Sequence, residues 1–208
     1  MKAPLSRSLA RITAISASAW FAFWACAPPA SLPPPVPMAA DQSFEIGAAA
    51  ETGELFKRSD PAFDEQTYGA QAWLQFRTGD PTEAGIVLAL SKPGLYAGGG
   101  YFRYRPVHTE HFTLGAQVEG GFLWASLGMP VAVSPMDNLW FYTEPAVGFN
   151  QLGLVQIPVG VSYEFAGHGM VDLEFGSFLG GGYVVETNYS STGGYLPGYV
   201  SLGFAYRN

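Results

Sequence analysis

Two histidines and a glutamate lie close together in one short segment, and their side chains are of the types that bind metal ions. The segment reads His108-Thr109-Glu110-His111, and imidazole and carboxylate ligands suit several divalent metals. It falls on a predicted turn without an evident third ligand, and it lacks the H-E-x-x-H order on a helix. His168 lies between two glycines in another predicted turn. The sequence therefore predicts solvated turns and no metal site.

Serines near predicted strand ends are the candidate nucleophiles for hydrolase or acyltransferase chemistry. They are Ser134, Ser190 and Ser191, and the chain has three histidines that could act as bases. Such catalysis needs a nucleophile, a base and an orienting group that converge at one place. No spacing links these residues. We therefore predict no catalytic site, no cofactor and no enzyme activity.

Charged residues recur on one face of the predicted strands, and they form the third candidate group. Because buried charges need partners, we expect a network of ion pairs that fills and stiffens the inside of a barrel. A small polar pore is the alternative. The predicted network consists of Arg77, Arg103, Arg105, Glu119, Glu144, Glu164, Asp172 and Glu174.

These residues are positioned by a repeat of period two that runs from about Tyr68 to Tyr206. In Phe112 to Ala125, large apolar residues such as Leu114 and Val118 alternate with small or polar ones such as Gly115 and Gln117. Period two indicates β-strands, since successive side chains point to opposite faces. One face is bulky and nearly free of charge, as a lipid-facing surface must be, and the other carries residues that fit inside a narrow tube.

The alternation predicts eight to ten strands joined by hairpin-like connections. Turns are predicted at residues 78–82, 91–94, 150–153 and 166–169, and a long exposed loop at 52–66. Residues 112–134 fit either one strand and a loop or two strands broken near Gly120-Gly121. The fold class is thus all-β: an antiparallel up-and-down transmembrane β-barrel, closed because unpaired strand edges find no water in lipid. The predicted strands cover residues 43–51, 68–76, 84–90, 95–105, 112–134, 139–149, 155–165, 171–179 and 195–206.

Composition supports this fold class. Charged residues make up 13%, aromatics 15%, and 26 of 208 residues are glycine. Low charge disfavours disorder, and abundant glycine disfavours a helical bundle. The net charge of −7 argues against nucleic-acid binding through a basic surface. Many aromatics are predicted near strand ends as interfacial girdles, with ordinary core packing as the alternative; they are Trp73, Tyr96, Tyr104, Trp124, Trp140, Phe141, Tyr142 and Tyr206.

The N-terminus has the features of an export signal. Lys2, Arg7 and Arg11 precede an apolar stretch from Ile12 to Ala25, which predicts a signal peptide over residues 1–25. Cys26 ends the stretch, and the order Phe23-Trp24-Ala25-Cys26 resembles a bacterial lipoprotein signal. That resemblance implies lipidation at Cys26, although Phe23 stands where such signals prefer leucine. Ordinary cleavage near Ala39 or Ala40 is the alternative.

A proline-rich segment follows the predicted signal. Residues 27–37 read APPASLPPPVP, a composition that favours extended polyproline geometry. We expect residues 26–42 to be a linker, either a stiff spacer or a disordered leader, and residues 43–208 to be the barrel.

The chain ends Ser201-Leu202-Gly203-Phe204-Ala205-Tyr206-Arg207-Asn208. This resembles the last strand of Gram-negative outer-membrane β-barrels, in which Ser201, Gly203 and Tyr206 would belong to the signal read by the barrel assembly machinery. Many of those proteins end on an apolar residue, and this chain ends on Asn208. The resemblance is to small barrels of OmpA- or OmpX-like architecture, and it implies an outer-membrane location and outer-membrane lipid as a partner.

Fold alone does not determine activity. We expect a structural or interaction barrel: a scaffold or docking component of a cell-envelope assembly, for example in adhesion or motility, that contacts other envelope proteins. One alternative is a narrow pore for small hydrophilic solutes. Another is a soluble periplasmic lipocalin-like barrel that binds an apolar ligand.

Overall fold

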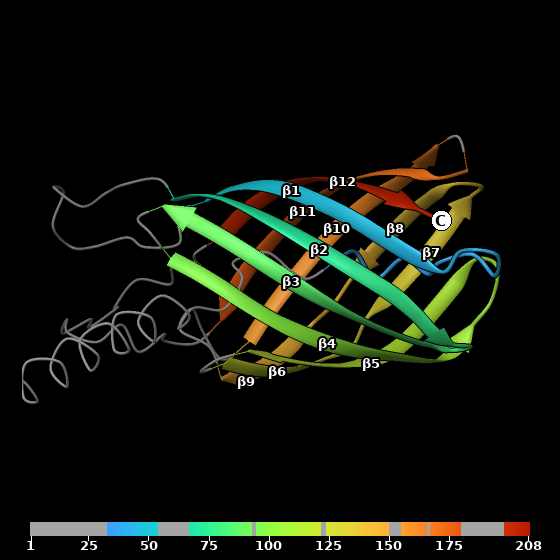
Figure 1. The fold of residues 1–208 in the computed structure, drawn as a ribbon, viewed down its shortest axis with the longest axis horizontal. Coiled ribbons are helices and arrows are strands. Elements are labelled where there is room, and N and C mark those ends of the chain that lie inside the picture. The colour runs from blue at the N-terminus through green and yellow to red at the C-terminus, as the bar shows by residue number, and fades with distance from the viewer. Residues whose placement is uncertain are drawn as a thin grey trace, which may run out of the picture.

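Antiparallel strands form one closed barrel (Figure 1). The computed structural model describes residues 33–53, 67–92, 95–121, 124–149, 155–165, 167–179 and 198–208. The first strand pairs with both the second and the last, so the sheet has no open edge there. None of the described residues belongs to a helix long and apolar enough to cross a membrane.

The described residues contain twelve strand segments. They are β1 (Phe44–Gly53), β2 (Thr67–Gly79), β3 (Thr82–Lys92), β4 (Leu95–His108), β5 (Phe112–Gly121), β6 (Trp124–Gly128), β7 (Val131–Met136), β8 (Leu139–Thr143), β9 (Ala146–Phe149), β10 (Val155–Phe165), β11 (Gly169–Leu179) and β12 (Gly198–Arg207).

Two of the barrel strands are each interrupted by a proline and so consist of two segments. The twelve segments therefore make a barrel of ten strands. β6 and β7 both pair with β5, and they flank Met129-Pro130. β8 and β9 both pair with β10, and they flank Glu144-Pro145. Proline cannot donate to a strand ladder, so the segments end there. Residues 112–134 form two strands, which is the second of the two predicted arrangements. The barrel has ten strands, the upper end of the predicted range of eight to ten.

The alternation of side chains matches the prediction. Ile157, Val159 and Val161 face outward, and Gln156 and Ser162 are buried inside. Exposed Ile86, Leu88 and Leu90 lie on the outer face of β3, and Leu202, Phe204 and Tyr206 on that of β12. An apolar exterior, a polar interior and closure of the sheet define a transmembrane β-barrel of the Gram-negative outer-membrane type. A lipocalin-like barrel is excluded, because its interior would be apolar.

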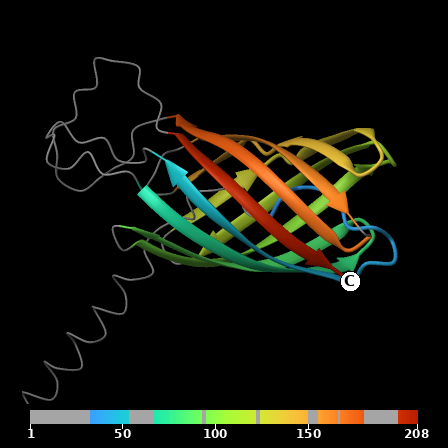
Figure 2. The same cartoon turned by 90° about the horizontal axis from the view of Figure 1, so that it is seen from above.

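The two ends of the barrel differ in their connections (Figure 2). At one end, the links between strands are short, and the C-terminus lies there; we call it the short-turn end. Its connections include Asp137-Asn138 between β7 and β8, where Asn138 takes a left-handed φ of 67°. At the other end, the loop end, residues 54–66 connect β1 to β2 and residues 180–197 connect β11 to β12.

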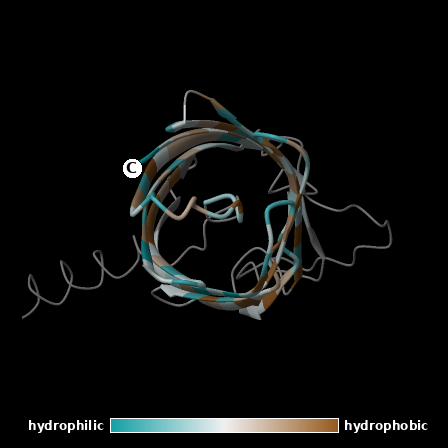
Figure 3. Ribbon diagram, turned by 90° about the vertical axis from the view of Figure 1, so that its right-hand side faces the viewer, coloured by the Kyte–Doolittle hydropathy of each residue, from teal (hydrophilic) through white to brown (hydrophobic). Residues whose placement is uncertain are grey.

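A segment of chain before β1 lies inside the barrel. Pro33, Pro35 and Val36 are less than 2% exposed, and residues 33–38 are all buried. Figure 3 looks along the barrel and shows this coloured segment within the ring of strands. From there the chain passes the short-turn end, where Ser43 and Phe44 donate to the carbonyl of Asn208 and β1 begins. These six residues thus do not behave as an exposed spacer, and the wall of the barrel encloses them.

Candidate functional site in the barrel lumen

The six buried residues, 33–38, are the plug segment. Four of them are prolines, which have no backbone N–H to satisfy. Their carbonyl oxygens still need donors once they leave water. Arg103 Nη2 donates to the Pro33 oxygen at 3.0 Å, and Arg207 donates to the oxygens of Val36 at 3.1 Å and Pro37 at 3.2 Å. A donor-poor chain is thus matched by a wall that supplies donors.

The plug segment also has an apolar contact with the wall. Val36 is fully buried in a cluster drawn from strands around the lumen. The cluster contains Ala49, Trp73, Ala132, Trp140, Tyr142, Met170 and Ala205. A charged side chain in place of Val36 would be buried among these groups instead of the apolar contact.

Arg207, the last residue of β12, joins the plug segment to two carboxylates. Its Nε donates to Glu45 Oε2 at 2.7 Å, and its Nη1 pairs with Glu164. Trp73 Nε1 donates to the other oxygen of Glu45 at 2.6 Å. Strands β1, β2, β10 and β12 are therefore tied together at the short-turn end through one guanidinium.

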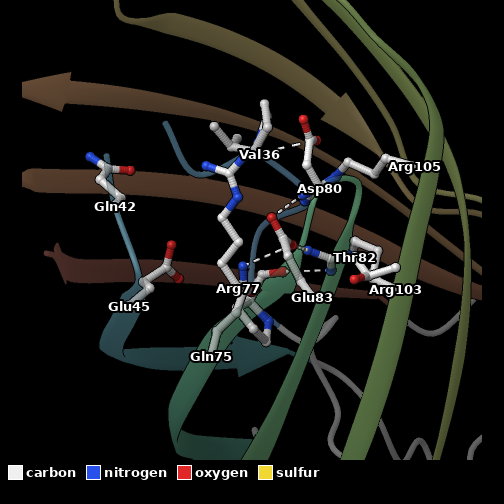
Figure 4. Close-up of polar contacts among 12 residues, drawn as sticks. Val36, Gln42, Glu45, Gln75, Arg77, Asp80, Thr82, Glu83, Arg103 and Arg105 are labelled. Atoms are coloured by element: carbon white, nitrogen blue, oxygen red, sulfur yellow. Dashed lines mark hydrogen bonds and ion pairs between the residues drawn. The ribbon is translucent and has the colours of Figure 1, made fainter. Parts of the chain in front are cut away.

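Glu83 is the centre of a second network, and Figure 4 shows it with Gln75, Arg103 and Arg105. It pairs with Arg105, lies 3.6 Å from Arg103 Nη1 and accepts from Gln75 Nε2 at 2.9 Å. Arg103 also lies 3.3 Å from Glu144. Arg103 Nε donates to Gln117 at 2.6 Å. This network joins β2, β3, β4 and β5 to the link between β8 and β9.

Nearer the loop end, tyrosine and amide groups replace arginine. Tyr199 donates to Glu174 at 2.6 Å and accepts from Gln156 Nε2 at 3.2 Å. Glu119 accepts from Gln117 at 3.2 Å and from Ser126. These carboxylates are held by neutral donors, whereas Glu45, Glu83, Glu144 and Glu164 pair with guanidinium groups.

Five large aromatic side chains lie against the inner wall, each directly opposite a glycine. A side chain added to any of these glycines would overlap the facing ring, so each ring lies over its glycine. Rings that cover glycines in this way lie along the wall instead of projecting toward the axis. The pairs are Trp73 and Gly47, Tyr101 and Gly85, Trp124 and Gly121, Tyr142 and Gly160, and Tyr199 and Gly176.

The predicted aromatic girdle is wrong for four of its members. Trp73, Trp124, Trp140 and Tyr142 are buried inside, because the strands place them at inward positions. Phe141, Tyr104 and Tyr206 do face outward, with between 45% and 48% of each side chain exposed. The side chain of Tyr96 lies outside the described set. The sequence reasoning did not use the pairing of an aromatic residue on one strand with a glycine on the next, which would have indicated an inward position.

The structure brings most of the predicted polar residues together. Arg103, Arg105, Glu144 and Glu164 take part in the two arginine networks. Asp172 is buried opposite Gly203, and a side chain at Gly203 would overlap its carboxylate. Arg77 lies at the rim, 3.8 Å from Asp80, and donates to the Ala39 oxygen at 2.9 Å. The sequence reasoning missed Glu45, Glu83 and Arg207, which continue the same period of two to the strand ends.

The remaining candidates lie at the ends of the chain or of the strands. Ser201 and Gly203 point into the lumen and Tyr206 points outward, while their reading by the assembly machinery stays a prediction. His108 and His111 are exposed near the short-turn end. Ser134 donates to the Met136 oxygen at 2.8 Å. The described part of the chain contains no group of three side chains suited to a metal ion. Cys26, Ser190 and Ser191 lie outside it.

Comparison with known proteins finds solved structures that are similar to this chain at low sequence identity. No family model and no curated protein matches it. It is similar to a KdgM porin, with 12% identity over 78% of this chain and 98% of the other and a TM-score of 0.44. It is also similar to Ail, the attachment invasion locus protein of Yersinia pestis, with 13% identity over 80% and 97% and a TM-score of 0.37. At these scores, the fold of this chain rests on its own strand pairing and on the chemistry of its two faces.

Proposed function

We propose that this chain is a closed outer-membrane barrel that acts as a structural or docking component of a cell-envelope assembly, for example in adhesion or motility. The observation that carries the proposal is the filled lumen. The plug segment is bound by two arginines, and ion pairs connect the surrounding strands. A barrel closed in this way interacts with its surroundings through its outer face and its two ends.

The lumenal networks also support a stiffening role. Breaking one partner of a buried ion pair costs about 3–5 kcal/mol, because the other charge is left uncompensated. Arg207 and Glu83 each join several strands, so they oppose local opening of the wall. Short turns face the periplasm in bacterial barrels of this kind, which orients the short-turn end, with the C-terminus, toward that side.

Two measurements test this function together. The full chain, reconstituted in planar bilayers, should give no conductance steps, and steps in the unmodified chain would contradict the closed barrel. After mild detergent extraction from its native envelope, the barrel should migrate in a complex with other envelope proteins. A lone monomer in that extract would count against a docking role. Lipidation at Cys26 is a separate proposal, tested by palmitate labelling of the wild type and of Cys26→Ser.

A further inference from the structure

The wall of the barrel and the plug segment fill different parts of the lumen. Five inward rings lie flat over glycines of the neighbouring strand, and they therefore occupy the layer next to the wall. The space nearer the axis, at the level of Arg207 and Arg103, holds residues 33–38. In a barrel of eight strands, the side chains of the wall alone nearly fill the interior. A barrel of ten strands encloses a wider lumen.

The plug segment is attached to the wall through side chains and not through the sheet. Residues 33–38 belong to no strand, and their bonds to the wall come from Arg103 and Arg207. Both arginines keep carboxylate partners of their own, Glu144 and Glu83 for Arg103, and Glu45 and Glu164 for Arg207. Departure of the segment would therefore leave the wall networks with their ion pairs intact.

The charge of the inner wall indicates which solutes would pass. Six carboxylate side chains and three arginines are buried in the described wall. The carboxylates are Glu45, Glu51, Glu83, Glu144, Asp172 and Glu174. An excess of carboxylates favours cations in a narrow polar pathway.

We propose that residues 33–38 are a separable plug that closes a pathway through this barrel, and that the pathway admits small hydrophilic cations in preference to anions. The inference goes beyond the docking role, since it gives the closed barrel a second, conditional activity. Its physical basis is the juxtaposition of a non-sheet, proline-rich segment with a wall whose large side chains lie flat.

A single buried charge offers the sharpest test. Val36→Glu adds a carboxylate to the apolar cluster around Val36, in a lumen whose wall already buries six carboxylates against three arginines, so it should expel the segment from the lumen. Ala40→Glu is the matched control, because Ala40 is exposed and only four residues further along. In planar bilayers, the Val36→Glu full chain should show discrete conductance steps that the wild type and Ala40→Glu lack. Its reversal potential in a potassium chloride gradient should have the sign of a cation-selective pathway.

A second variant guards against misfolding. Replacing residues 33–38 by glycine and serine in the full chain keeps its length and adds no charge to the lumen. Folding is checked by circular dichroism before recording. Steps in this variant support the plug. Folded variants that stay closed would overturn it while leaving the closed-barrel function in place, and an anion-selective reversal potential would overturn the proposed solute class. Steps in the wild type would instead contradict the closed barrel itself.

Discussion

The two halves of the lumen are filled by different means. In the short-turn half, Arg207 and Arg103 bind both carboxylates and the carbonyl oxygens of a separate segment. In the loop half, Tyr199 donates to Glu174 and accepts from Gln156, so a tyrosine and an amide take the place of the guanidinium groups. Guanidinium groups have several donors in a fixed fork and stay charged, so they can serve wall and segment together. A tyrosine hydroxyl has one proton to donate.

This difference predicts that substitutions in the short-turn half are more costly. Arg207→Ala removes the shared donor and leaves the buried Glu45 and the partly buried Glu164 without their charge partner. We expect a loss of about 3–5 kcal/mol in the free energy of unfolding. Urea titration in lipid vesicles, followed by tryptophan fluorescence, measures it.

Arg77→Ala is the control for that titration. Arg77 also carries a guanidinium and also donates to the segment before β1, but its ion pair with Asp80 is partly exposed. The Arg77→Ala variant should lose less than about 1 kcal/mol of unfolding free energy, as expected for an exposed ion pair. Equal losses at positions 77 and 207 would show that the buried network does not stabilise the short-turn half.

Two glycines sharpen the comparison between the halves. Gly160→Ala would push the Tyr142 ring off the wall and toward the cluster that holds Val36. Overpacking of this kind costs about 1–3 kcal/mol. Gly176→Ala would push Tyr199 in the same way, but in the half without the plug segment. We therefore expect the larger loss of unfolding free energy at position 160.

The same urea titration, applied to both alanine variants, gives the difference between the two sites. Gly120→Ala serves as a further control, because an added methyl group there has more room. A larger loss at position 176 than at 160 would mean that the plug segment does not restrict the space in the short-turn half.

A smaller effect than that of Arg207→Ala is expected from a hydroxyl in the loop half. Tyr199→Phe removes the donor to Glu174 and the acceptor for Gln156. Loss of such hydrogen bonds costs about 1–3 kcal/mol when the partners stay buried. Tyr163→Phe, on the outer face, should leave stability nearly unchanged. A loss at 199 as large as that of Arg207→Ala would break the proposed difference between the halves.

The wall of the barrel could be predicted because each strand repeats one simple rule. Ile157, Val159 and Val161 alternate with polar residues, and membrane and lumen impose opposite chemistry on the two faces. Strand breaks at Met129-Pro130 and Glu144-Pro145 were harder to place, because a proline in a strand can mark an edge, a bulge or an interruption.

The contents of the lumen were less accessible to sequence reasoning. A proline-rich stretch predicts a spacer, because the stiffness of such a segment is a local property. Its burial depends on two arginines that lie 70 and 171 residues away in the sequence. The sequence predicts a girdle position for the inward aromatics, because a tryptophan's position near a strand end does not tell which face it occupies. Cross-strand register, which pairs Trp73 with Gly47 and Tyr142 with Gly160, supplies that information.

The location of the plug segment is tested most directly by thiol labelling. Val36→Cys and Ala40→Cys, each in a Cys26→Ser background, are folded in lipid vesicles and treated with a maleimide too large to enter the lumen. The cysteine at position 36 should stay unlabelled until the barrel is unfolded, while the cysteine at position 40 should react in the folded state. Equal labelling of both positions in the folded barrel would contradict the enclosure of residues 33–38.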